Sequence, residues 1–314
     1  MNKILKKFNI RKKLNLKITV IVTLIMVLGL GTLSFFINST VNEEITALAK
    51  NRNKNITKDL QSQINSFLKE SKRVVEFLAT EDSFKQNNQT EINKTLDNII
   101  KNYPQFTYIS FGTKNGKMLS YPLSDLGDDY DPRERPWYKQ AKNSNKTIWT
   151  ETYTDAGTGD LIITVAKKVK DRNGNLVGVV SGDISLQKIS KVINQTKVGK
   201  TGNTFLVDKN GGFLAHPNQE LIKNNANVDR LFDLKEVLST KNNIFEYKNK
   251  NEEMLVSYLP IEEIQGTVFA QIPTEEAYQA NQKVLKTTTI LSIIVLLVLL
   301  VSIILYISKR IINP

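Results

Sequence analysis

One short segment, YDPRERPWY, combines side chains that together can bind a small charged molecule. It begins at Tyr130, and its Arg135 offers a planar set of donors that fits a carboxylate through two hydrogen bonds. Trp137, Tyr130 and Tyr138 can form apolar walls, and each carries a polar group that can bond to a ligand. Because a proline follows Arg135, we expect this arginine to project from a stiff, extended loop ahead of a short helix, PWYKQAKN.

Two acidic residues further along the chain could complete such a site. Asp155 lies in TETYTDAGTGD, at the mouth of a predicted hairpin, and Asp183 lies near the end of the almost apolar run LVGVVSGDISL. A carboxylate there needs a partner, because burying an unpaired charge is costly. With Arg135 for a carboxylate and the two acids for an ammonium, the residues describe a zwitterion site. One alternative is that Arg133 and Arg135 pair on the surface with Glu134 and with Asp128, Asp129 or Asp131. Another is an internal salt bridge between Asp183 and Arg135 or Arg133.

The sequence offers little for metal or covalent chemistry. It has no Cys and a single His, His216, which excludes a thiolate zinc site, a Cys nucleophile and a multi-histidine metal site. The acidic run DLGDDYD misses the spacing of a calcium loop, and the Gly-x-Ser-x-Gly, HExxH and phosphate-loop motifs are missing. We therefore predict no metal, no cofactor and no enzymatic activity. A membrane-anchored hydrolase that uses Ser and acid residues is the weakest alternative.

Two uncharged stretches, residues 18–37 and 287–308, predict transmembrane helices. Each has about the ~20 apolar residues that a helix needs to cross a bilayer. The first stretch is too long for the ~7–15 residue core of a cleaved signal peptide. Residues 1–17 are basic, without an acid, and residues 309–314 contain Lys309 and Arg310, so the positive-inside rule places both termini in the cytoplasm. Residues 38–286 would then form an extracellular domain.

The net charge of +12 does not indicate nucleic-acid binding. The two membrane flanks carry nine of these charges, which leaves about +3 for the whole external region. That is too little for a basic stripe. The flanking lysines instead suit a membrane with anionic lipid.

The external region begins with helices and continues with short strands. Residues 38–100 are polar, with apolar positions at helical spacing, which predicts that the first membrane helix continues as a long external helix. Residues 90–102 predict a second helix. From Phe106 onward the runs are short, β-rich and broken by turns. The apolar positions of the long helix recur mostly every three or four residues: Ile45, Leu48, Ile56, Leu60, Ile64, Phe67, Val74, Val75 and Leu78.

A repeat divides the strand-rich part into two modules. GTKNGKMLSYP (112–122) aligns with VDKNGGFLAHP (207–217) at a constant offset of 95 residues. Their Asn-Gly pairs, like that of DRNGN, predict two-residue hairpins with a type I′ turn. We expect an α+β fold with a long N-terminal helix and two tandem PAS-like modules with antiparallel sheets, at about 103–190 and 200–275.

The motif Tyr-x4-Arg-x-Trp-Tyr followed by two spaced Asp resembles the double Cache sensor family. The resemblance covers residues 38–286, between the two membrane helices, and is strongest to the amino-acid-binding branch found on bacterial chemoreceptors and sensor kinases. It implies that a free L-amino acid binds in the membrane-distal module. The implied roles fall on six residues: Arg135 and Trp137 for the ligand carboxylate, Tyr130, Asp155 and Asp183 for the ligand amine, and Tyr138 for the aromatic wall.

The last residues, KRIINP (309–314), resemble the opening of a HAMP linker. An output domain would normally follow, so either the sequence is a fragment or the natural protein lacks its own output. We expect a homodimeric chemoreceptor of the methyl-accepting chemotaxis protein family, with cytoplasmic signalling partners only if an output domain exists. Alternatives are the sensor part of a histidine kinase or cyclase-type receptor, and a structural or partner-binding ectodomain without a small-molecule ligand.

Overall fold

The computed structural model has the predicted α+β fold. It describes residues 2–123, 126–127, 129–240, 242–249 and 252–307. The predicted start of a HAMP-like linker, residues 309–314, lies outside the described residues. The chain divides into two compact units, residues 52–274 and the two terminal segments 1–51 and 275–314.

The terminal unit consists of apolar helices. It contains the first part of α1 (Asn2–Leu78) and all of α9 (Gln279–Ile307). Each of these helices has a stretch long and apolar enough to cross a membrane. The large apolar side chains of both stretches are exposed, as a lipid-facing surface requires. A hydrogen bond of 2.8 Å between the hydroxyls of Ser34 and Ser292 joins the two helices.

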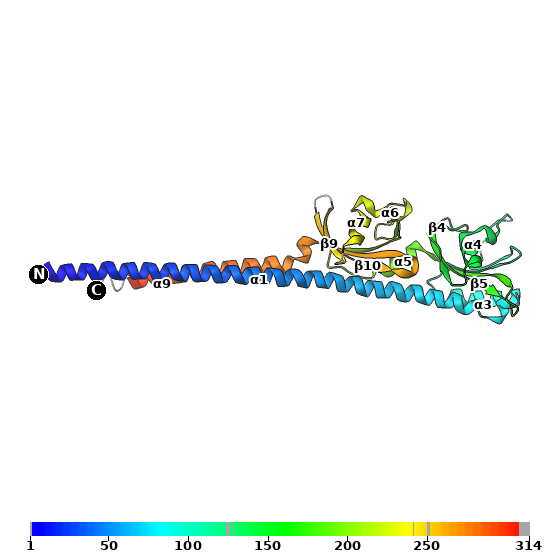
Figure 1. Ribbon diagram of the computed structural model, residues 1–314, viewed down its shortest axis with the longest axis horizontal. Helices are drawn as coiled ribbons and strands as arrows, with labels where there is room; N and C mark the ends of the chain where they lie inside the picture. The colour runs from blue at the N-terminus through cyan, green and yellow to red at the C-terminus, as the bar shows by residue number, and fades with distance from the viewer. Residues whose placement is uncertain (1, 124–125, 128, 241, 250–251, 308–314) are drawn as a thin grey trace. The chain divides into compact units, whose positions relative to one another are not determined.

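Helix α1 continues without a break beyond its apolar stretch, as the sequence predicts (Figure 1). Residues 52–78 of this helix belong to the second unit. Their apolar face is buried, with exposed fractions of 0–1% at Leu60, Ile64 and Leu68. This part of α1 therefore contributes one stripe to the core of the second unit, as the spacing of the apolar residues predicts.

The first sheet of the second unit is antiparallel, with the strand order β2-β1-β6-β5-β3, and β4 pairs with β5. Its inner face packs Ile109, Phe111 and Val165 against helices α1 and α3, and its outer face lies under α4. Side chains alternate along each strand, so Asp183, Ser181 and Val179 share the outer face. The strands are β1 (Tyr108–Thr113), β2 (Met118–Tyr121), β3 (Ile148–Trp149), β4 (Tyr153–Thr154), β5 (Leu161–Lys170) and β6 (Leu176–Ser185).

Short helices connect and flank the strands of the first sheet. Helix α3 matches the predicted second helix within one residue, and Asn88 caps it by accepting a hydrogen bond from the Glu91 N–H. Helix α4, which carries Trp137, has the predicted sequence PWYKQAKN. The elements are α2 (Asp82–Lys85), α3 (Gln89–Asn102), the 3-10 helix η1 (Pro132–Glu134), α4 (Pro136–Asn143) and α5 (Leu186–Asn194).

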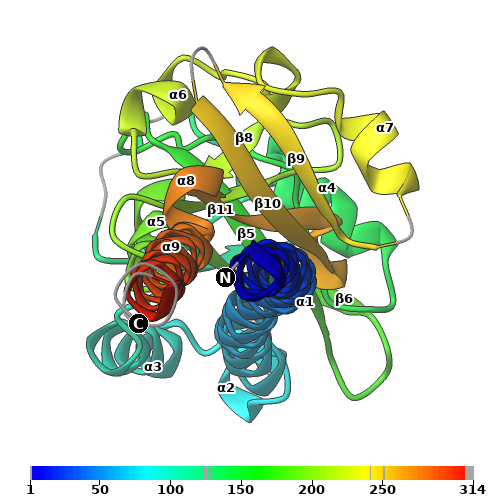
Figure 2. The ribbon, with the colours of Figure 1, turned by 90° about the vertical axis from the view of Figure 1, so that its left-hand side faces the viewer.

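The second sheet repeats the topology of the first, with the strand order β8-β7-β11-β10-β9. Figure 2 shows β9 beside β10, as their antiparallel register requires. The strands are β7 (Asn203–Val207), β8 (Phe213–Ala215), β9 (Ile244–Asn249), β10 (Glu252–Ile261) and β11 (Gly266–Pro273). The helices are α6 (Gln219–Lys223), η2 (Val228–Arg230), α7 (Leu234–Ser239), η3 (Glu262–Ile264) and α8 (Thr274–Ala277).

The three Asn-Gly turns are hairpins, but the predicted type I′ geometry is wrong. Only the glycines Gly116, Gly174 and Gly211 have positive φ, of 84–89°, and the preceding asparagines do not. In each turn the glycine N–H donates to the carbonyl of the residue three positions earlier. This pattern is a type I turn followed by a left-handed glycine, which a three-residue loop favours over the two-residue type I′ turn.

Candidate functional site

The loop before α4 is built from local capping bonds and prolines. Asp131 accepts a hydrogen bond from the Arg133 N–H and so caps η1, while Pro136 begins α4. Arg135 lies between the two helices with φ −76° and ψ 148°, the extended backbone that a following proline favours. Its side chain therefore leaves the chain from a fixed point, as the sequence predicts.

Helix α4 covers the outer face of the first sheet. Trp137 and Tyr138 are each 2% exposed and pack edge-on, with ring centroids 5.5 Å apart. The close approach requires glycine at position 112, where an added Cβ would lie 2.9 Å from the tip of the Trp137 ring. The Tyr138 hydroxyl donates to the Thr113 carbonyl over 3.3 Å. This helix fixes the edge of a cavity on that face.

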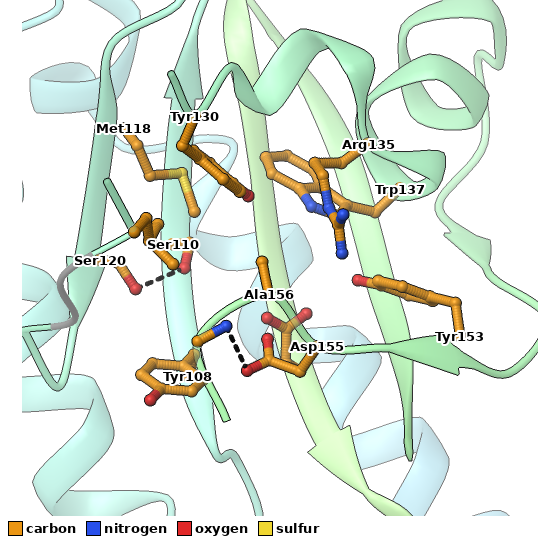
Figure 3. Close-up of a pocket in the computed structure, with 13 residues that line it drawn as sticks. Tyr108, Ser110, Met118, Ser120, Tyr130, Arg135, Trp137, Tyr153, Asp155 and Ala156 are labelled. Carbon is orange, nitrogen blue, oxygen red and sulfur yellow. Dashed lines mark hydrogen bonds between the residues drawn. The ribbon is translucent and has the colours of Figure 1, made fainter. Parts of the chain in front are cut away.

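A cavity lies beside α4 on the outer face of the first sheet (Figure 3). Five of the six residues predicted for the site line it, and Tyr138 does not. Tyr138 instead packs against Trp137 inside the protein, and its hydroxyl donates to the backbone of β1. The lining consists of Tyr108, Ser110, Met118, Ser120, Leu126, Tyr130, Arg135, Trp137, Tyr153, Asp155, Ala156, Gly157 and Asp183.

Arg135 has no carboxylate partner among the described residues. Its guanidinium donates to the Thr154 carbonyl over 2.9 Å and lies 5.5 Å from the centre of the Tyr153 ring. Arg133, two residues earlier, forms the surface ion pair with Asp131 at 2.6 Å. The surface-pair alternative therefore holds for Arg133, whereas Arg135 forms no ion pair within the described residues and is available to an anion.

Asp183 is a buried carboxylate, 6% exposed, at the floor of the cavity. It accepts one hydrogen bond, of 2.7 Å, from the Thr164 hydroxyl, and it forms no ion pair in the part of the chain that the structure describes. Burial raises the pKa of Asp183 to about 7, helped by the Asp155 charge and opposed by the Thr164 hydrogen bond and by Arg135. A ligand cation at this position would supply the missing partner.

Asp155 serves both its own loop and the cavity. Its Oδ2 accepts three hydrogen bonds, from the Gly157 N–H, the Thr158 N–H and the Thr158 hydroxyl, at 2.7–3.0 Å. These bonds hold the carboxylate in place. The other oxygen, Oδ1, has no partner within the described residues. Figure 3 shows Asp155 and Arg135 pointing toward the same space.

Two neutral residues that sequence reasoning missed, Tyr153 and Thr164, contact the charged groups of the site. The Tyr153 hydroxyl bonds to the Thr164 hydroxyl at 2.6 Å, and Thr164 in turn donates to Asp183. Burial raises the pKa of Tyr153 above its ordinary value, so this phenol stays neutral. Its position two residues before Asp155 was an available signal, because side chains two apart on a strand share a side.

In the second module, the position that corresponds to Asp183 is Gln271, and its side chain has hydrogen-bond partners within the protein. Asp183 pairs with Tyr108 in the first sheet, and Gln271 pairs with Asn203 in the second, 95 residues after Tyr108. Gln271 accepts a hydrogen bond from the Tyr247 hydroxyl at 2.8 Å and donates to Asn203 Oδ1 at 3.0 Å. A neutral amide with local partners thus replaces the unpaired carboxylate, and this position offers no charge to a ligand.

Asp183→Asn is expected to stabilise the ligand-free protein above pH 7. The pKa of Asp183 is higher in the folded state, about 7, than the ordinary 3.8, so its favourable contribution is complete below pH 3.8 and is lost as pH rises through 7. The loss amounts to about 4 kcal/mol at most, at 1.36 kcal/mol per pKa unit. The melting temperature of the variant at pH 8 should exceed that of the wild type. An equal or lower value would show that Asp183 has a partner when no ligand is bound.

Comparisons with known proteins identify the family of this chain. The methyl-accepting chemotaxis protein McpC of Bacillus subtilis is 31% identical over 295 residues, which cover 91% of this chain and 43% of McpC. PscA, a methyl-accepting chemotaxis protein of Pseudomonas syringae pv. tomato, is 44% identical over 117 residues, which cover 37% of this chain and 18% of PscA. The chain therefore spans less than half the length of these relatives.

Solved structures share the fold of this chain. The ligand-binding domain of the Pseudomonas fluorescens chemoreceptor CtaA in complex with L-alanine has a TM-score of 0.63 and 25% identity, over 73% of this chain and 99% of that domain. That of Pseudomonas aeruginosa PctB in complex with L-Arg has a TM-score of 0.60 and 24% identity, over 71% of this chain and 94% of that domain, which bears on the fold alone. The dCache_1 model, described as a Cache domain, matches residues 36–280. With two tandem sheets of like topology behind one long helix, this chain belongs to the double Cache family.

Proposed function

We propose that this chain is the sensor part of a transmembrane chemoreceptor and that it binds a free L-amino acid in the cavity of the first module. The observation that carries the proposal is a cavity lined by two groups of opposite charge, Arg135 and Asp183, neither of which forms an ion pair within the described residues. Leaving such groups without partners is costly, so a ligand that pairs with both gains strongly from binding. A zwitterion is the simplest molecule that does so.

Each residue of the site has a role in this proposal. Arg135 holds the ligand carboxylate through two donors, with the Trp137 indole N–H as a further donor. Asp183 and the free oxygen of Asp155 hold the ammonium, and Tyr130 contributes a hydroxyl. Burial raises the pKa of Tyr130 to about 12, so this hydroxyl remains neutral and can accept or donate. Tyr153 closes the wall beside Arg135, and Tyr138 supports Trp137 from within the protein.

Signalling across the membrane is the second part of the proposal. Both apolar helices would span the bilayer, and the basic flanks would place the two termini in the cytoplasm and the Cache modules outside. Ligand binding would favour one of two arrangements of a receptor homodimer, and an output domain, where one is attached, would respond to that change. The CtaA domain was solved with L-alanine, which supports an amino acid as the ligand.

A thermal-shift panel tests the proposal directly. The full chain in lipid nanodiscs would be melted with each common L-amino acid, and with simple amines and organic acids as controls. A ligand of the folded state adds about 2.7 kcal/mol of stability at a hundred times its dissociation constant. We expect some amino acids to raise the melting temperature and the controls to fail, because neither control pairs with both charges. A flat panel on a folded protein would support a structural ectodomain instead.

A further inference from the structure

The end of the cavity away from Arg135 has a distinct composition. Strands β1 and β2 supply it, and their register places Ser110 opposite Ser120 and Gly112 opposite Met118. Side chains two apart on a strand share a face, so Ser110, Ser120 and Met118 lie together on the cavity side. Figure 3 shows these three residues across the cavity from Arg135, Trp137 and Tyr153.

This end offers hydroxyls and a thioether, and no charge among its described residues. The Ser110 hydroxyl donates to the Ser120 hydroxyl at 2.9 Å. Ser181, next to Ser110 in register and 1% exposed, has a hydroxyl without a partner in the described part of the chain. The remaining neighbours in the lining are Tyr108 and Leu126.

The three charged groups of the lining are all needed for the backbone groups of an amino acid. Arg135 would pair with the carboxylate, and Asp155 and Asp183 with the ammonium. A charged ligand side chain that entered the far end would lose its hydration and find no opposite charge among the lining residues that the structure describes there. Such a penalty gives selectivity by exclusion, which is as effective as a gain in attraction.

We propose that Ser110, Met118 and Ser120 form the subsite for the ligand's side chain and that this subsite selects uncharged amino acids. The inference rests on the proposed function. The flexible thioether of Met118 lets the subsite adapt to side chains of different size, whereas the serines limit the apolar surface. Small aliphatic and hydroxyl-bearing side chains, as in L-alanine and L-serine, fit this chemistry.

Calorimetric titration of the full chain in nanodiscs with L-serine, L-alanine, L-lysine and L-aspartate tests the subsite. We expect the two uncharged ligands to bind at least about tenfold more tightly than the two charged ones. Met118→Glu places a carboxylate among the subsite residues and should raise the affinity for L-lysine at least about tenfold. Met118→Gln, which has nearly the same shape and no charge, should give no such gain. Ser120→Asp repeats the test at a second position if Met118→Glu does not fold.

The outcomes separate the subsite from the proposed function. If the wild type binds L-lysine or L-aspartate as tightly as L-serine, and Arg135→Ala removes that binding, the proposed function stands and the subsite assignment is wrong. Equal gains for L-lysine in the Glu and Gln variants would also overturn it, because charge would not be the cause. If none of these four amino acids binds while another amino acid of the thermal-shift panel does, the subsite assignment falls and the proposed function stands; if no amino acid of the panel binds, both proposals fall.

Discussion

Arg135→Ala should remove amino-acid binding and leave the fold intact. The side chain makes one hydrogen bond to the protein, to the Thr154 carbonyl, and is only partly buried, so the domain does not depend on it. The ligand carboxylate, by contrast, would lose its only cationic partner. Truncating one member of a buried charge pair costs about 2–5 kcal/mol, which is roughly a 30-fold to several-thousand-fold loss of affinity. Calorimetric titration with the best ligand of the panel measures this loss.

The chain offers a matched control two residues earlier. Arg133 has the same side chain in the same loop, but it pairs with Asp131 at 2.6 Å on the surface. Arg133→Ala should therefore leave the ligand affinity within about fivefold of the wild type, because surface ion pairs contribute ~1 kcal/mol or less. Arg135→Lys keeps the charge and loses the planar pair of donors, so an intermediate loss is expected. Normal binding by Arg135→Ala would refute the carboxylate assignment.

Much of the fold follows from local patterns in the sequence. The spacing of Leu60, Ile64 and Leu68 predicts the buried stripe of α1, and the proline after Arg135 predicts both the extended loop and the start of α4. The repeat at an offset of 95 residues predicts two modules, which the matching strand orders confirm. The turn type was wrong because Asn-Gly occurs in two-residue and three-residue loops alike, and the loop length decides between them.

The site could be predicted only where its residues are close in sequence or belong to a familiar motif. Trp137 and Tyr138 are adjacent in a helix and so point about 100° apart, which explains why only Trp137 reaches the cavity. Met118 and Ser120 reach it through the pairing of β2 with β1 and of β1 with β6. Such a register depends on the whole sheet, and no local pattern in the sequence encodes it.

The affinity for an amino acid should fall at acidic pH because Asp183 must be ionised to hold the ammonium. Its pKa in the ligand-free protein is about 7, raised by burial. The groups that face Asp183 are Asp155, Arg135, Thr164 and the phenols of Tyr130 and Tyr153. Above pH 7 the carboxylate is charged, and the affinity should reach its maximum. Below pH 7 the ligand must displace a proton, so the affinity should fall about tenfold per pH unit.

Two variants decide whether Asp183 is the group responsible. Asp183→Asn should bind weakly, without the pH dependence, because its amide cannot pair with an ammonium as a carboxylate does. His216 is the only histidine of the chain and packs against Phe205 and Phe213 in the second module. Burial lowers its pKa below 6.5, and His216→Asn should retain the full dependence. Because Asp183→Asn should melt at a higher temperature while binding less ligand, its loss of affinity cannot be ascribed to unfolding. Equal affinity at pH 5 and pH 8 in the wild type would exclude Asp183 as the ammonium partner.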